Sequence, residues 1–146
     1  NGDNAATFAA GKVSDEAKRL CDTTKESLYK GIEAAVAGGR LGDVGHAVQS
    51  YCEDRGYGVV GEYTGHGVGT KLHEDPSVPN FGTPGRGVRL LPGMVIAIEP
   101  MINEGTAAIK QMPDGWTVKT KDGKLSAHFE HTVAITANGP LILTQA

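Results

Sequence analysis

The chain has 146 residues, which is enough for one domain with its own hydrophobic core and too few for two. A hydrophobic fraction of 39% and a charged fraction of 21% exclude a disordered chain, and a net charge of −3 provides no basic surface for nucleic acid. No apolar run approaches the ~20 residues that cross a bilayer, so we expect neither nucleic acid nor a membrane as a partner.

The first elements predicted are a short strand and a helix. A strand-like stretch surrounds Thr7 and Phe8. Ser14 then offers a helix N-cap, and Asp15 and Glu16 in the first turn complement the helix dipole. The apolar side chains that share one face of this helix are Ala17, Leu20, Cys21, Leu28, Ile32, Ala35 and Val36. The pair Gly38-Gly39 is expected to end the helix.

A second amphipathic helix is predicted to start near Asp43 and to stop at Gly56. Its apolar stripe consists of Val44, Ala47, Val48, Tyr51 and Cys52. Cys21 and Cys52 lie inside the two helical patterns, far from any CxxC spacing. We therefore expect reduced, buried thiols in a cytoplasmic protein rather than a disulfide, which is the alternative.

The rest of the chain has the pattern of β-structure. Residues 57–60 predict a short strand, residues 61–87 a loop-rich stretch, and residues 93–100 a buried strand that ends in a carboxylate and a proline. A hairpin is predicted to turn at Asp122-Gly123, and a second turn at Asn138-Gly139. Two helices followed by a mostly antiparallel sheet predict an α+β fold.

Two glutamates occupy positions that an ordinary strand would not choose. Glu99 ends an apolar run, and Glu130 interrupts a strand-like run. A buried, unpaired carboxylate is costly, so each needs a partner or a metal, although an outward-facing position explains either one alone. Together with His66, which stands between two glycines, they form an oxygen-rich set that suits Mn, Fe, Co or Zn.

Three stretches carry a family resemblance. They are GEYTGHGVGTKLHEDPSVPNFG, LLPGMVIAIEPMIN and DGWTVKTKDGKLSAHFEHTVAIT. In this order they closely resemble type I methionine aminopeptidases of the pita-bread metallopeptidase family, from residue 1 to about residue 144. The resemblance implies half of a pita-bread fold, with two helices packed on a curved, mostly antiparallel sheet. It also implies that residues 1–146 form a single truncated domain, the second half of the family's catalytic domain.

The same resemblance assigns a metal site. Asp3 in NGD matches the family's bridging aspartate, His66 its histidine ligand, Glu99 the glutamate of its I-E-P motif, and Glu130 its bridging glutamate. The family carries a further aspartate upstream, which binds only the second metal and has no counterpart here. The expected cofactor is therefore one divalent ion per chain, Co, Mn, Fe or Zn.

The resemblance further implies the removal of N-terminal methionine from peptides and nascent proteins. Glu99 matches the carboxylate that moves the proton, and His73 the histidine that contacts the scissile amide. Trp116 matches an aromatic that borders the methionine pocket. Leu72 stands where the family commonly has phenylalanine, so it changes the shape of that pocket.

Two other functions are compatible with the same residues. One is a weakly active or inactive metal-binding or interaction module of this fold, and the other is a peptidase for X-Pro bonds. A homodimer, or a complementary N-terminal half, is a further expected partner, because a half fold leaves strand edges and apolar surface bare.

Three histidines fall outside the assigned site. His46 is expected at the surface and His131 as a structural side chain on the opposite strand face. His128 lies two positions before Glu130 and therefore on its face, which brings it close to the carboxylates.

Overall fold

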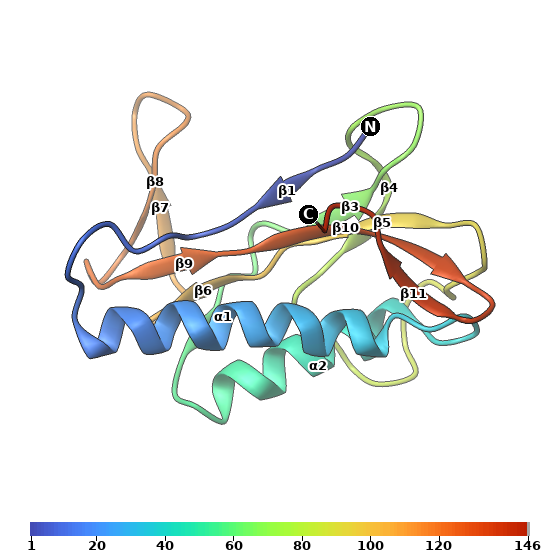
Figure 1. Cartoon of the computed structure of the whole chain (residues 1–146). Helices are drawn as coiled ribbons and strands as arrows, with labels where there is room; N and C mark the ends of the chain where they lie inside the picture. The colour runs from blue at the N-terminus through green and yellow to red at the C-terminus, as the bar shows by residue number, and fades with distance from the viewer. Residues whose placement is uncertain (146) are drawn as a thin grey trace.

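The two predicted helices lie side by side along one face of the strands (Figure 1). A computed structural model describes residues 1–145. In it α1 spans Asp15–Ala34 and α2 spans Leu41–Glu53. The apolar face of each helix is turned toward the strands, so the hydrophobic core lies between the helix layer and the sheet layer.

The ends of both helices follow local polar contacts. The Ser14 hydroxyl accepts a hydrogen bond from the backbone N–H of Ala17 (3.2 Å), as predicted for the N-cap of α1. The helix ends at Ala34, four residues before the glycine pair. The second helix begins at Leu41, two residues earlier than predicted, because the Asp43 carboxylate accepts a hydrogen bond from the backbone N–H of Arg40 (2.8 Å).

Eleven strands form three antiparallel sheets within residues 1–145. The largest sheet has the strand order β1 (Asn4–Ala5), β10 (Glu130–Thr136), β5 (Val95–Ile98), β3 (Gly65–Gly67) and β4 (Glu74–Val78). Its sixth strand, β11 (Gly139–Ile142), also pairs with β10. The second sheet has the order β2 (Gly58–Val59), β6 (Met101–Asn103), β9 (Ser126–His128). Strands β7 (Ile109–Gln111) and β8 (Val118–Thr120) form a hairpin that stands away from the helices (Figure 1). The α+β class and the two helices on a mostly antiparallel sheet are confirmed.

Two local predictions are wrong and one is incomplete. The first strand is Asn4–Ala5 and not residues 7–8, because its partners Glu130 and His131 lie opposite residues 5 and 4. The stretch 61–87 contains strands β3 and β4, whose glycines and prolines hid the period-2 pattern. The strands on either side of Asp122-Gly123 belong to different sheets, so no hairpin turns there. The turn at Asn138-Gly139 does join paired strands, as predicted.

The main core cluster joins both helices to the central strands. Its members are Leu28, Ile32, Ala35, Leu41, Val44, Val78, Leu90, Ile96, Ile98, Val133 and Ile135. Cys52 is fully buried, Cys21 is partly buried, and both are free thiols. Within residues 1–145, no helix is long and apolar enough to span a membrane.

Gly45 of α2 lies directly against the loop that follows β4, and this contact should make Gly45→Ala destabilising. An alanine Cβ would overlap the backbone carbonyl of Phe81 and crowd that of Pro79. Overpacking of this kind costs about 1–3 kcal/mol, which exceeds the roughly 1 kcal/mol that alanine gains over glycine in a helix. Urea unfolding measures the loss. His46→Ala, on an exposed position of the same helix, is the control, and a Gly45→Ala chain as stable as wild type would contradict the packing described here.

Candidate metal centre

Strand pairing brings the four proposed ligands together. Glu130 opens β10, the central strand of the largest sheet, and Glu99 follows directly after its neighbour β5. His66 lies in β3, on the far side of β5, and Asp3 precedes β1, on the far side of β10. Segments that lie far apart in the sequence therefore place one ligand-type side chain each at the same place on the sheet.

The imidazole of His66 is the centre of the cluster. Its Nε2 lies 3.3 Å from Glu99 Oε1 and 3.6 Å from Asp3 Oδ2. His66, Glu99 and Glu130 each offer one ligand atom, and these three atoms lie within 4.8 Å of one another. The same holds for one ligand atom each of Asp3, His66 and His73. The two groups share His66. The structure thus brings together all four residues that the resemblance assigns to the metal.

The glycines on either side of His66 allow β3 to approach its neighbours closely. A Cβ at Gly65 would overlap the backbone carbonyl of Ala97 in β5, and one at Gly67 would overlap the carbonyl of Asp75 in β4. Only glycine fits such contacts. The sequence Gly-His-Gly therefore presses the histidine backbone against two strands and fixes where its ring points.

The proton of His66 has a defined place. Nδ1 lies 2.9 Å from the Gly67 carbonyl oxygen, which can only accept, so Nδ1 carries the hydrogen. Nε2 is then the nitrogen that faces the carboxylates, and it is a buried atom with no hydrogen-bond partner. An imidazole held through Nδ1 in this way leaves Nε2 for a metal.

Asp3 and Glu99 are held through their backbones. The buried Thr132 hydroxyl donates to the Asp3 carbonyl and accepts from the Asp3 N–H, both at 2.8 Å. Asn80, which is 1% exposed, donates from Nδ2 to the Glu99 carbonyl at 3.1 Å. Each carboxylate therefore extends from a fixed point of the chain toward His66.

Glu130 shows that the cluster lacks positive charge. Its side chain is buried, and Oε1 has no hydrogen-bond partner. Burial, followed by the neighbouring carboxylates of Glu99 and Asp3, raises the pKa of Glu130 to about 7, and His128 partly opposes this. Two buried ligand atoms without partners and three crowded carboxylates fit a divalent cation, which would satisfy all of them.

The residues expected to contact substrate lie at different distances from this cluster. His73 is exposed at the rim, with its ring centroid 4.1 Å from that of His66 and its Nε2 4.0 Å from Asp3 Oδ2. Leu72 is 39% exposed beside it. Trp116 is 91% exposed in the turn of the β7–β8 hairpin and does not line the cavity described next.

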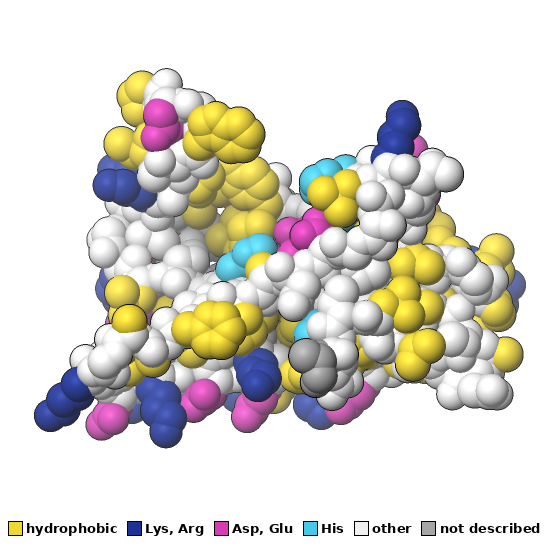
Figure 2. Space-filling view, turned by 45° about the horizontal axis from the view of Figure 1, so that its top comes forward, with side chains coloured by type: hydrophobic (Ala, Val, Ile, Leu, Met, Phe, Trp, Pro, Cys, Tyr) yellow, Lys and Arg dark blue, Asp and Glu magenta, His cyan; other side chains and the backbone are white. Residues whose placement is uncertain are grey.

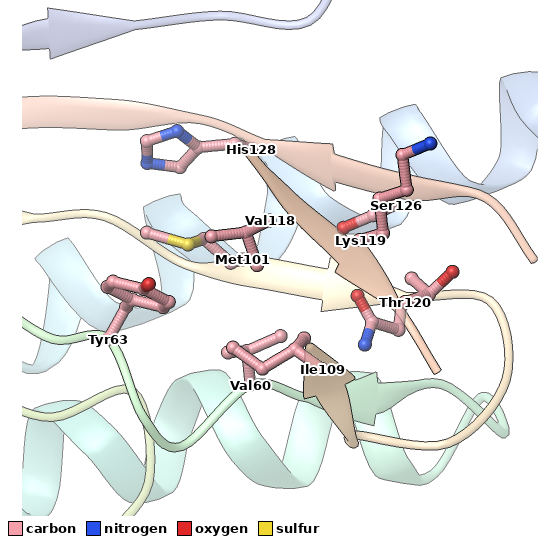
Figure 3. A pocket seen from close by; sticks show the side chains of 10 residues that line it. Val60, Tyr63, Met101, Ile109, Val118, Lys119, Thr120, Ser126 and His128 are labelled. Atoms are coloured by element: carbon pink, nitrogen blue, oxygen red, sulfur yellow. The ribbon is translucent and has the colours of Figure 1, made fainter. Parts of the chain in front are cut away.

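A cavity of about 230 Å³ lies beside the cluster. Figure 3 shows side chains that line it. His128 lines it and also places Nε2 3.6 Å from Glu99 Oε2. The apolar part of the lining is Val60, Tyr63, Met101, Ile109 and Val118. In Figure 2 histidine and acidic side chains gather in a hollow whose wall is hydrophobic. The sequence placed His128 on the face of Glu130 by its spacing, whereas Tyr63 and Met101 carried no recognisable signal.

The remaining histidines behave as predicted. His46 is exposed. His131 Nδ1 lies 2.9 Å from the Thr144 hydroxyl, and its ring meets that of Tyr29 edge-on, with centroids 5.9 Å apart. Burial, and then the charge of Lys25, lowers the pKa of His131. It is a structural side chain on the face away from the cluster.

Comparison with known proteins gives a consistent family. Residues 1–137 match metallopeptidase family M24. A methionine aminopeptidase of Clostridium acetobutylicum is 57% identical over 143 residues, which are 98% of this chain and 57% of that protein. Methionine aminopeptidase 1 of Bacillus subtilis is 54% identical, over 99% of this chain and 58% of its own length. The chain therefore spans a little over half the length of these curated relatives.

Solved structures share the fold. The crystal structure of a methionine aminopeptidase from Thermotoga maritima superposes with a TM-score of 0.97 at 50% identity, covering 99% of this chain and 58% of that one. A prolidase from Pyrococcus horikoshii superposes with a TM-score of 0.74 at 26% identity, over 99% of this chain and 36% of that one. The half pita-bread arrangement predicted from the resemblance is confirmed.

The raised pKa of Glu130 predicts that the metal-free protein loses stability as pH rises. The folded state keeps this proton up to about pH 7, whereas the unfolded chain releases it near the ordinary value of about 4.3. The contribution is complete below the unfolded pKa and lost as pH rises through the folded one. Urea unfolding in EDTA between pH 5 and 8 should show a fall on the order of 2–3 kcal/mol. Glu130→Gln, which cannot ionise, should flatten this slope, and equal slopes in the two proteins would contradict it.

Proposed function

Because this chain belongs to metallopeptidase family M24, we propose that it carries the metal centre for removing N-terminal methionine from peptides and nascent proteins. The observation that supports this most strongly is the buried, partnerless Nε2 of His66, which faces two carboxylates. The names and sequences of the relatives from Clostridium acetobutylicum and Bacillus subtilis support methionine as the residue released.

The proposed ligands are Asp3, His66, Glu99 and Glu130, which would hold one divalent ion. Three carboxylates and one imidazole suit Mn, Fe, Co or Zn and lack the thiolates of most structural zinc sites. A divalent ion at this place supplies a Lewis acid that polarises a carbonyl oxygen and lowers the pKa of water. The sharing of His66 by both candidate ligand groups supports a single ion.

Glu99 is the proposed proton carrier. Its side chain is only partly buried, whereas that of Glu130 is almost inaccessible, so water and substrate reach Glu99 more readily. Glu99 therefore takes a proton from the attacking water and passes it to the leaving amine. Glu130 and Asp3 are proposed to act only as ligands, since both carboxylates lie close to other members of the cluster.

His73 is the proposed contact to the scissile amide. It stands exposed at the rim, beside the ring of His66, where its ring can donate a hydrogen bond to a carbonyl oxygen as negative charge develops there. Leu72 lies next to it on the same exposed segment and is proposed to contact the substrate side chain. The 230 Å³ cavity beside Glu99 offers apolar walls to a substrate side chain. Trp116 is proposed only as an outer contact, since its side chain lies outside that cavity.

Peptide hydrolysis tests this function. The Mn²⁺-loaded chain should release free methionine from Met-Ala-Ser and leave Ala-Pro intact, and EDTA should stop the release. His66→Ala should lower the rate by roughly a hundredfold or more, because metal stabilisation of the transition state is worth several kcal/mol.

The control for this experiment is His46→Ala, an exposed change on α2 that should leave the rate unchanged. A chain that binds Mn²⁺ and releases no methionine would contradict the enzymatic proposal and favour an interaction module. Cleavage of Ala-Pro in preference to Met-Ala-Ser would replace it with an X-Pro peptidase.

A further inference from the structure

The imidazole of His128 has an unexplained position. Its Nε2 is buried and has no hydrogen-bond partner, although the side chain as a whole is 35% exposed. That atom faces Glu99 Oε2 at 3.6 Å. A buried donor without a partner is costly, so this arrangement calls for a reason.

Glu99 is enclosed by two imidazoles. Oε1 faces His66 Nε2 at 3.3 Å, and Oε2 faces His128 Nε2 at 3.6 Å. The Glu99 backbone is already fixed, because Asn80 Nδ2 donates to its carbonyl oxygen. What remains free is rotation of the carboxylate, which decides which oxygen points toward His66. Among residues 1–145, His128 is the polar neighbour of the second oxygen.

The strands place His128 at the boundary between cavity and cluster. It ends β9 and pairs with Met101, which begins β6 two residues after Glu99. Glu130 follows two residues later as the first residue of β10. In Figure 3 the ring of His128 extends over Met101 at one end of the cavity. It therefore reaches Glu99 from the side opposite to His66.

We infer that His128 is a positioning residue for Glu99. Its Nε2–H donates to Glu99 Oε2, which turns Oε1 toward His66 and toward the ion that the proposed function requires. The present 3.6 Å closes to hydrogen-bond distance when the site is loaded, as such contacts tighten in the working state of a site. The two histidines then have complementary roles, since His66 presents a lone pair to the metal and His128 presents a hydrogen to the carboxylate.

Metal binding separates this role from the alternatives. Isothermal titration with Mn²⁺ should show that His128→Leu, which has no donor, binds on the order of tenfold or more weakly, as is typical when a partner of a metal ligand is removed. His128→Gln should bind nearly as well as wild type, because its amide nitrogen reaches the place of Nε2 and donates a hydrogen. The kcat for Met-Ala-Ser should fall in His128→Leu more than KM rises, since the proton carrier is displaced.

His131→Gln is the matched control, being a partly buried histidine of the adjoining strand on the face away from the cluster. It should keep wild-type Mn²⁺ affinity, and thermal unfolding of each metal-free variant reports whether it folds. Equal losses in His128→Gln and His128→Leu would overturn the inference and make His128 a direct ligand. A His128→Leu chain that binds Mn²⁺ as wild type does would overturn the role of His128 alone. A wild-type chain that binds no Mn²⁺ would overturn the proposed function, and this role with it.

Discussion

Repulsion among Asp3, Glu99 and Glu130 governs the chemistry of this protein. The three carboxylates lie around one imidazole, and the most deeply buried of them has its pKa raised to about 7 by burial and by the other two. Gathering like charges in a place that water barely reaches does not by itself stabilise the folded state. On the proposed function, a divalent cation would stabilise the arrangement by replacing the proton of Glu130 and by giving the unpartnered ligand atoms a partner. Metal binding and the pH dependence of stability are therefore two consequences of one charge imbalance.

The fold keeps these groups together despite their repulsion by fixing the backbone that carries each one. Thr132 holds Asp3 through two hydrogen bonds, and Asn80 holds the carbonyl of Glu99. Gly65 and Gly67 let β3 press against its neighbours, which fixes the backbone that carries His66. With the backbones fixed, small side-chain rotations set which atoms face the metal. A histidine at the edge of the cavity can consequently control a ligand without binding the ion.

The sequence predicted those features of the fold that depend on residues close together in the chain. The capping of α1 by Ser14 and the apolar run before Glu99 were readable from the sequence, and the family resemblance assigned the four ligands that the structure brings together. The predictions that were wrong concern strands whose pairing depends on residues far away in the sequence. The strand at Asn4–Ala5 exists because β10 lies opposite it, and residues 118–120 pair with β7 although Asp122-Gly123 has the composition of a hairpin turn. No short-range pattern shows that Trp116 lies outside the cavity lining or that Tyr63 and Met101 belong to it, since both depend on how three sheets meet.

The most direct test is X-ray absorption of the chain loaded with one equivalent of Co²⁺. The ligand set Asp3, His66, Glu99 and Glu130 predicts scattering from a single imidazole, with oxygen completing the shell. In His66→Ala that imidazole signal should disappear, while His128→Gln should keep it. Two or more imidazoles around the ion, a sulfur ligand, or an imidazole signal that survives His66→Ala would contradict the assignment of the metal centre.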